Sequence, residues 1–123
     1  MSISEAEATV MEALWREAPL SARDIVDRVG SARGWQEGTV KSLLNRLLRK
    51  RAVKAVRDGR RYLYRPLLTR EQYVFGESKY LLDRLFGGRV APLVAHFSER
   101  RKLSKKDVAQ LRQLLQELDD DPS

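Results

Sequence analysis

The segment from Val40 to Leu48 has the most regular apolar pattern in the chain. Its apolar side chains recur at intervals of three and four residues, as Val40, Leu43, Leu44, Leu47 and Leu48. An α-helix turns once in 3.6 residues, so this spacing places all five side chains on one face. We therefore predict a helix whose apolar face forms part of a protein core.

The opposite face of this predicted helix is polar and basic. It carries Thr39, Lys41, Ser42, Asn45, Arg46, Arg49 and Lys50, without a carboxylate. Hydroxyl, amide and cationic side chains can donate hydrogen bonds to phosphates and to base edges. We predict that Thr39, Lys41, Ser42 and Asn45 read DNA bases, and that Arg46, Arg49 and Lys50 contact the DNA backbone.

Two short extended segments follow the polar helix, at residues 52–56 and 60–65. Asp58-Gly59 between them is typical of the tight turn of a β-hairpin. The second segment begins with Arg60, Arg61 and Tyr62, and we predict that these residues contact the DNA backbone.

Two further helices are predicted upstream. Ser4 with Glu7, and Ser21 with Asp24, have the spacing of capping boxes, in which a serine and an acid three residues later satisfy the first turn of a helix. One helix is therefore expected over about residues 5–17. A second, short helix is expected from the cap at Ser21 to a stop at Gly30. Three helices followed by a basic two-stranded ribbon is the order of a winged helix, whose third helix enters the major groove.

The net charge of +7 is concentrated in one block of the chain. Residues 41–65 carry 10 Lys and Arg against 1 Asp, whereas residues 1–40 carry 4 against 7 and residues 66–123 carry 10 against 9. A basic run is often only a solvated surface. Here the run coincides with the polar helix and the hairpin, which favours double-stranded DNA as the partner.

The remaining residues, 68–123, contain apolar helical stripes but too few elements to enclose a core alone. Helices are expected from Thr69 to the Gly87-Gly88 pair, over residues 90–97, and after a cap at Ser104 and Asp107. We predict a winged-helix DNA-binding domain at 1–67 and a helical dimerisation domain at 68–123, with a homodimer interface of Leu81, Leu85, Leu93, Phe97, Leu111, Leu115 and Leu118. The alternative is that these helices pack back on the N-terminal half.

Several classes of function are excluded by what the chain lacks. It has no cysteine and a single histidine, so we expect no metal and no cofactor. The lone His96 has no recognisable nucleophile or carboxylate partner, which argues against an enzyme and for a core or interface histidine. No segment approaches the roughly 20 apolar residues of a membrane span, and the N-terminus lacks signal-peptide features, so we expect a cytoplasmic protein without membrane insertion.

Five segments resemble the BlaI/MecI/CopY family of bacterial transcriptional repressors. They are EAEATVMEALW (5–15), GTVKSLLNRLLRK (38–50), DGRRYLYRPL (58–67), the Gly87-Gly88 pair with LVAHF (93–97), and LSKKDVAQLRQLL (103–115). The resemblance implies a winged helix followed by three dimerisation helices, and a repressor that binds dyad-symmetric operators of β-lactam resistance or copper-handling genes.

The resemblance also implies roles for particular residues. Thr39, Lys41 and Ser42 fall where the family's recognition helix meets bases and phosphates, and Arg60 and Arg61 fall on the wing. In the β-lactam-responsive branch, a membrane-linked metalloprotease receptor leads to repressor cleavage beside a Phe. His96 and Phe97 occupy that place here, with His where the family typically has Asn, so the resemblance implies a candidate cleavage site at this bond. The alternative is that His96 and Phe97 are only packing residues and that repression is relieved by another route.

Two departures from the family pattern are informative. Gln36-Glu37-Gly38 stands where the family often has Ser-Pro-Lys, which removes a strong helix cap and a basic contact. The copper-responsive branch relies on C-terminal cysteines, which this chain lacks, and copper sensing is therefore disfavoured. A winged helix that contacts proteins or coats DNA without sequence preference is the alternative function, although a dimer with two reading helices matches a palindromic site.

Overall fold

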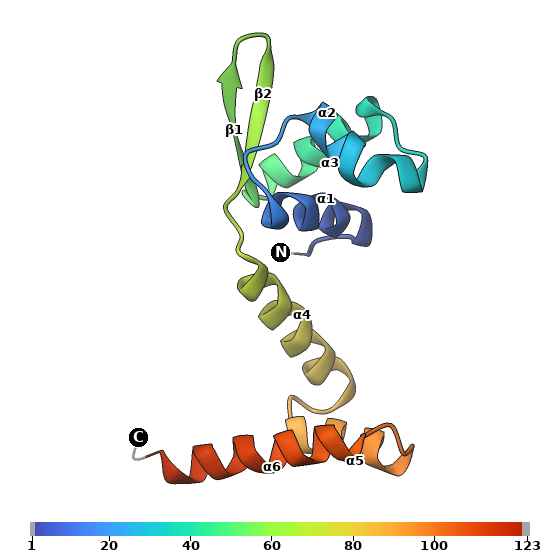
Figure 1. Cartoon of the computed structure of the whole chain (residues 1–123), viewed down its shortest axis with the longest axis vertical. Coiled ribbons are helices and arrows are strands. Elements are labelled where there is room, and N and C mark those ends of the chain that lie inside the picture. Colours follow the sequence, from blue (N-terminus) through green and yellow to red (C-terminus); the bar gives the residue numbers. More distant parts are fainter. Residues whose placement is uncertain (1, 122–123) are drawn as a thin grey trace. The chain divides into compact units, whose positions relative to one another are not determined.

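A computed structural model describes residues 2–121 of the chain (Figure 1). Three helices come first, α1 (Glu5–Arg16), α2 (Ala22–Ile25) and α3 (Glu37–Arg49). A hairpin of β1 (Val53–Asp58) and β2 (Arg61–Pro66) follows, and then α4 (Arg70–Leu85), α5 (Val90–Glu99) and α6 (Lys105–Asp120). The predicted order of three helices, a hairpin and three further helices is confirmed.

The second helix is less regular than predicted. After α2 the chain continues as a π-helical turn, Val26–Gly30, and a 3₁₀ turn, Ser31–Arg33. Gly34 then ends this run with a φ of 69°, a left-handed conformation that glycine adopts without a steric penalty. The helical run therefore reaches Gly30 as predicted, but it continues for three residues where a loop was expected.

The chain divides into two compact units, Met1–Phe75 and Gly76–Ser123. The boundary lies inside α4, beyond the one predicted after residue 67, because the start of α4 is attached to α1. Trp15 Nε1 donates a hydrogen bond of 2.8 Å to the backbone oxygen of Leu68, and the rings of Trp15 and Tyr73 are 5.5 Å apart. These are long-range contacts that local sequence patterns do not reveal.

The core of the first unit lies between α1, α2, α3 and β2. Its side chains include Val10, Met11, Leu14, Leu20, Ile25, Val40, Leu43, Leu44 and Leu47, all buried. The apolar face predicted for the third helix is thus confirmed, with Leu48 half-buried at its edge. Burial of this face fixes which side of α3 remains exposed.

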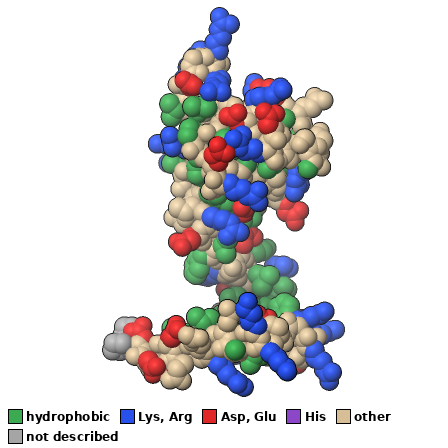
Figure 2. All heavy atoms as spheres, in the orientation of Figure 1, with side chains coloured by type: hydrophobic (Ala, Val, Ile, Leu, Met, Phe, Trp, Pro, Cys, Tyr) green, Lys and Arg blue, Asp and Glu red, His purple; other side chains and the backbone are tan. Residues whose placement is uncertain are grey.

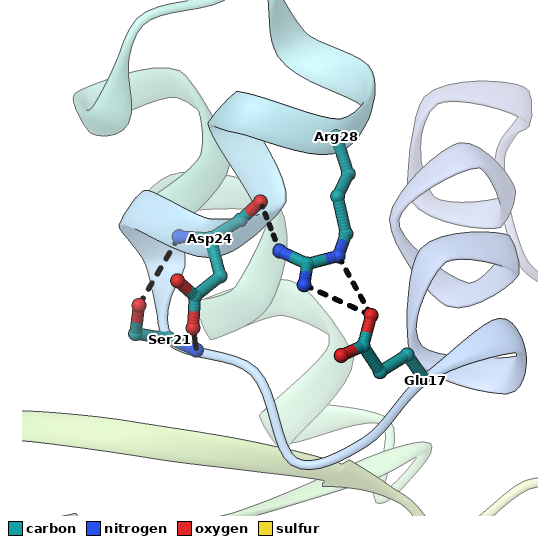
Figure 3. Close-up of polar contacts among 4 residues, drawn as sticks. All are labelled: Glu17, Ser21, Asp24 and Arg28. Atoms are coloured by element: carbon teal, nitrogen blue, oxygen red, sulfur yellow. Dashed lines mark hydrogen bonds and ion pairs between the residues drawn. The ribbon is translucent and has the colours of Figure 1, made fainter.

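Polar contacts hold the turn between α1 and α2 (Figure 3). The predicted capping box is present, since Asp24 N donates to Ser21 Oγ (3.1 Å) and Ser21 N donates to Asp24 Oδ2 (3.0 Å). Arg28 joins this turn to the end of α1, donating from Nη2 to Glu17 Oε2 at 2.9 Å and from Nη1 to the backbone oxygen of Asp24 at 3.3 Å. The start of α2 is thereby fixed.

The hairpin differs from the prediction by one residue. Asp58 pairs with Arg61 across the two strands, so the two-residue turn is Gly59-Arg60 and not Asp58-Gly59. Gly59 has a φ of 64°, which is the reason that the turn needs a glycine there. Asp58 extends the strand instead, and its Oδ2 lies 3.4 Å from Arg61 Nη2.

The hairpin is attached to the helical core through its second strand. Tyr64 N donates to the backbone oxygen of Leu20 at 2.7 Å, and Leu20 N donates to that of Tyr64 at 3.1 Å. The Tyr64 side chain is buried, whereas Tyr62, closer to the hairpin tip, is 48% exposed. The base of the hairpin is therefore fixed to the core, and its tip projects into solvent.

The second unit has a different character, because no described side chain in residues 76–121 is buried. Its helices end and begin where the sequence predicts. Gly87 and Gly88 both take left-handed conformations after α4, and Ser104 and Asp107 cap α6. Pro92 lies in the first turn of α5, where a missing N–H costs no hydrogen bond. The helices form without enclosing a core.

Candidate nucleic-acid interface

Helix α3 exposes the polar face that the sequence predicts. Thr39, Lys41, Ser42, Asn45, Arg46 and Arg49 are all exposed, while the apolar face lies in the core. From Gly38 to Arg49 the helix has no carboxylate. The structure therefore leaves these six side chains accessible to a ligand, with three cations among them.

Lys50 is different from the other cations of this segment. Its ammonium lies 2.7 Å from Oε1 of Glu7 on α1 and 2.8 Å from the backbone oxygen of Ser2. Glu7 is 2% exposed, so this ion pair is a bond between the end of α3 and the start of α1. The structure gives Lys50 an internal partner, with which its predicted contact to the DNA backbone competes.

The electrostatics of Glu7 depend on this ion pair. Burial alone would raise its pKa, but the hydrogen bond and charge of Lys50, with hydrogen bonds from Ser4, outweigh burial and lower the pKa. Oε2 of Glu7 is buried and has no hydrogen-bond partner among the described residues. The Glu7 carboxylate is thus stabilised in its charged form at neutral pH by few hydrogen-bond donors.

The hairpin presents a second basic surface. Arg60 lies in the turn and Arg61 opens β2, and both are exposed. The guanidinium of Arg57 lies 5.9 Å from the ring centre of Tyr62, which keeps a cation beside an exposed aromatic ring. Figure 2 shows Lys and Arg side chains at the hairpin tip, at the top of the view.

A hollow of about 310 Å³ separates α3 from the hairpin and the start of α2. Its lining consists of Ser21, Ala22, Arg23, Glu37, Lys41, Arg60, Arg61, Tyr62 and Tyr64. The hollow therefore brings together predicted base-reading and backbone-contacting residues. Four of its lining side chains are cations, and Glu37 is their single carboxylate.

Glu37 and Lys41 form an ion pair on one turn of α3. Glu37 Oε1 lies 3.3 Å from Lys41 Nζ, and both side chains are about half exposed. Such exposed pairs contribute little to stability. The pair nevertheless sets where the lysine ammonium lies before any ligand arrives.

Arg23, Glu37 and Tyr64 line the hollow without having been predicted as site residues. Arg23 sits just after the cap of α2, and no local motif links it with α3. Burial raises the pKa of the Tyr64 hydroxyl, with an opposing effect of Lys41. Of these three residues, only Glu37 stands out in the sequence itself, because it lies where the chain departs from the family pattern.

The helices of the second unit carry the residues predicted for dimerisation. Leu81, Leu85, Phe97, Leu115 and Leu118 are exposed, and Leu93 and Leu111 are half-buried. Leu93 and Phe97 of α5 and Leu111 of α6 line one apolar groove of about 320 Å³. His96 is exposed, with its ring 5.7 Å from that of Phe97, so it is not a core histidine within one copy of the chain.

Two properties of the described residues, 2–121, bear on other classes of function. No group of three or more His, Asp or Glu side chains there could hold a metal ion. None of the helices in that range is long and apolar enough to cross a membrane.

The fold and its exposed surfaces define a class of protein. A recognition helix with an exposed polar face, next to a basic hairpin and on a three-helix core, is a winged-helix DNA-binding domain. The family follows from comparison with known proteins. Residues 3–117 match the penicillinase repressor family, and the chain belongs to that family.

Named relatives support this membership over most of the chain. The chain is 28% identical to a penicillinase repressor of Bacillus licheniformis over 115 residues, which cover 94% of this chain and 90% of the relative. It is 27% identical to a penicillinase repressor of Staphylococcus aureus over 118 residues, 96% of this chain and 94% of the relative.

A solved structure supports the fold of the first unit. The solution structure of the DNA-binding domain of the repressor BlaI is similar to this chain with a TM-score of 0.53 and 26% identity. The match covers 58% of this chain and 88% of that domain. The chain is thus a DNA-binding transcriptional repressor and not an enzyme, as the sequence predicts.

Proposed function

We propose that the repressor acts as a homodimer on a dyad-symmetric operator, with α3 reading bases and the hairpin contacting phosphates. The observation that carries the proposal is the hollow between α3 and the hairpin, where Lys41 and Arg61 face a shared space. Thr39, Ser42 and Asn45 extend the reading surface along α3, and Arg46 and Arg49 reach neighbouring phosphates. Arg60 and Tyr62 add backbone contacts from the hairpin.

The two surfaces should have different effects on affinity. A side chain in the major groove discriminates between bases, while a wing arginine mainly releases counterions from phosphates. Lys41→Ala and Ser42→Ala are therefore expected to reduce the preference for operator over random DNA, by about 1–3 kcal/mol for each good contact. Arg61→Ala should weaken binding to both DNAs alike and lower the salt slope by about one.

The test is a salt titration of binding to an operator selected from random duplexes and to a random duplex of equal length. Lys54→Ala is a matched control, because Lys54 is an exposed cation of β1 outside the hollow. An equal loss of discrimination from Lys41→Ala and Arg61→Ala would contradict the assignment. A wild-type protein that protects every duplex alike would favour a DNA-coating function instead.

The homodimer is supported by the lack of any buried side chain in residues 76–121. Exposed leucines on α4 and α6, with Phe97 on α5, lose contact with water if a second copy covers them. A fragment of residues 1–75, which retains the contacts of Trp15 with Leu68 and Tyr73, is expected to be folded and monomeric. The double substitution Leu111→Glu with Leu115→Glu should make the full chain monomeric as well, because it would bury charge at the interface. Sedimentation that shows a dimeric 1–75 fragment would refute the assignment of dimerisation to the C-terminal helices.

The names of the relatives support a proposal for the regulated genes. Because two of them are penicillinase repressors, we propose that this repressor also controls β-lactam resistance genes, in the cytoplasm where the chromosome lies. We further propose relief of repression by cleavage between His96 and Phe97, under a membrane-linked metalloprotease receptor. A cut there separates α6 from the rest of the dimerisation helices, and loss of the second half-site lowers avidity by about 10²–10⁴.

Both residues at the proposed cleavage site are exposed, but their bond lies within α5, so cleavage needs local unfolding of this helix. The test is to treat cells of the native host with a β-lactam and to map the fragment ends by mass spectrometry. Fragments that end at His96 are expected. Intact repressor with an active target promoter would rule the mechanism out.

A further inference from the structure

The charges of α6 are arranged against the dipole of the helix. Lys105 and Lys106 begin the helix, and Glu117, Asp119 and Asp120 lie in its last turn, which has no basic residue. A helix has a partial positive charge at its N-terminus and a partial negative charge at its C-terminus. Although Asp107 caps the first turn, cations at the start and carboxylates at the end both oppose the dipole.

The basic end of α6 is part of a larger cluster. Residues 100–106 contain five cations, Arg100, Arg101, Lys102, Lys105 and Lys106, and no carboxylate. Figure 2 shows Lys and Arg side chains at one end of the unit that contains α6 and acidic side chains toward the other end. The unit is therefore strongly polarised along α6.

The two ends of one α6 helix are too far apart to neutralise each other. Lys106 and Asp120 are separated by about 21 Å at a rise of 1.5 Å per residue. Screening at physiological ionic strength acts over about 8 Å. A charged partner that lies alongside the helix is needed to bring opposite charges together.

An apolar stripe runs between the two charged ends. Val108, Leu111, Leu115 and Leu118 follow one another at intervals of three, four and three residues, beside Leu114. Leu115 and Leu118 are 59% and 68% exposed, whereas Val108 and Leu111 are half-buried and Leu111 lines the groove beside α5, so the C-terminal half of the stripe has no cover within one copy of the chain. Helices with this spacing pair along their stripes.

We propose that α6 pairs in antiparallel orientation with α6 of a second copy, an inference that rests on the proposed homodimer. When Val108 lies level with the partner's Leu118, Lys106 lies level with the partner's Asp120. Both ends then meet opposite charges, and each helix terminus gains the charge that its dipole favours. A parallel pair would instead bring five cations against five and carboxylates against carboxylates.

Charge reversal at one end and at both ends tests this orientation. Lys105→Glu/Lys106→Glu and, separately, Asp119→Lys/Asp120→Lys are each expected to weaken the homodimer by about tenfold to a hundredfold, since both ends then meet like charges. The chain that carries all four substitutions should dimerise like the wild type. An equimolar mixture of the two single-end variants should form heterodimers in preference to either homodimer.

The controls separate orientation from folding and from net charge. Lys105→Glu/Lys106→Glu places carboxylates at the helix start, which favours the helix, so circular dichroism should show unchanged or increased helicity. Lys54→Glu/Arg57→Glu makes the same change in net charge on exposed residues of β1 and should leave dimerisation unchanged. In 1 M salt, the differences between the variants should largely disappear.

Sedimentation equilibrium of the full chain distinguishes the outcomes. Single-end variants that dimerise like the wild type would overturn the antiparallel pairing. A chain with all four substitutions whose dimerisation is weaker than that of the wild type would overturn it as well. Preferential pairing of Lys105→Glu/Lys106→Glu with the wild-type chain would indicate a parallel arrangement. A wild-type chain that stays monomeric at every concentration would refute the homodimer itself.

Discussion

Replacement of Lys50 by methionine is expected to destabilise the winged-helix unit. Methionine keeps an apolar stem but removes the ammonium that lies 2.7 Å from Glu7 Oε1 and 2.8 Å from the backbone oxygen of Ser2. The carboxylate of Glu7, 2% exposed, then keeps the backbone N–H of Ser4, at 3.0 Å, as its donor among the described residues.

The expected loss in free energy of unfolding lies between two known limits. An exposed ion pair contributes up to about 1 kcal/mol, and removing one partner of a fully buried pair costs about 3–5 kcal/mol. The Lys50 side chain is 30% exposed, so water partly screens its charge. We expect a loss of about 2–3 kcal/mol, which corresponds to a decrease of about 10–20 °C in Tm for a unit of this size.

The pH dependence of the variant has a definite sign. In the wild type the pKa of Glu7 is lowered, so its stabilising effect is present above the unfolded value of about 4.3 and is lost as pH falls through the folded value. In Lys50→Met burial raises this pKa, so the folded state binds a proton more tightly than the unfolded state does. The difference in stability between the two proteins should therefore shrink from pH 7 to pH 5.

Urea denaturation at both pH values, at one protein concentration, measures these differences. Lys54→Met, at an exposed position of β1, should change stability by less than about 0.5 kcal/mol. Glu7→Gln added to Lys50→Met should restore much of the loss, because glutamine keeps the acceptor for Ser4 without the charge. A Lys50→Met protein as stable as the wild type, or a difference that grows on acidification, would refute the reasoning.

Two further predictions concern the interface and the junction between the units. Glu37→Gln removes the single carboxylate of the hollow and should tighten binding to random duplex DNA by about threefold, as measured by fluorescence anisotropy; unchanged or weaker binding would contradict a position facing DNA. Trp15→Phe removes the hydrogen bond to the Leu68 backbone oxygen and should cost about 1 kcal/mol, or about 4–8 °C in Tm. Trp35→Phe is the control, because its ring nitrogen has no hydrogen bond to a described residue; equal effects of the two changes would refute the proposed anchor.

The features that the sequence predicted correctly all have short-range causes. The buried stripe of α3 depends on intervals of three and four residues, and the caps at Ser4, Ser21 and Ser104 depend on an acid three residues later. Side chains this close meet whenever the helix forms, so the pattern alone specifies the contact. The exposed polar face of α3 follows directly, since it is the other side of the buried stripe.

The prediction that failed within the hairpin concerns a choice between two turns that the local sequence leaves open. Both Asp58-Gly59 and Gly59-Arg60 can form a two-residue turn, and the choice decides which residue pairs with Arg61. The contacts of Tyr64 with Leu20 hold β2 in place on the core. Register therefore depends on a contact between residues that are 44 positions apart, and the turn motif does not contain this information.

By itself, the sequence determined the order of the elements, the buried and exposed faces of α3, and the helix ends of the second unit. The tertiary structure decided that Lys50 binds Glu7, 43 residues away, that the first turns of α4 belong to the N-terminal unit, and that Glu37 shares a hollow with wing arginines. The physical reason is the range of the interactions. Helix periodicity and capping act within a few residues of the chain, whereas ion pairs and hollows form between surfaces that meet after the chain has folded.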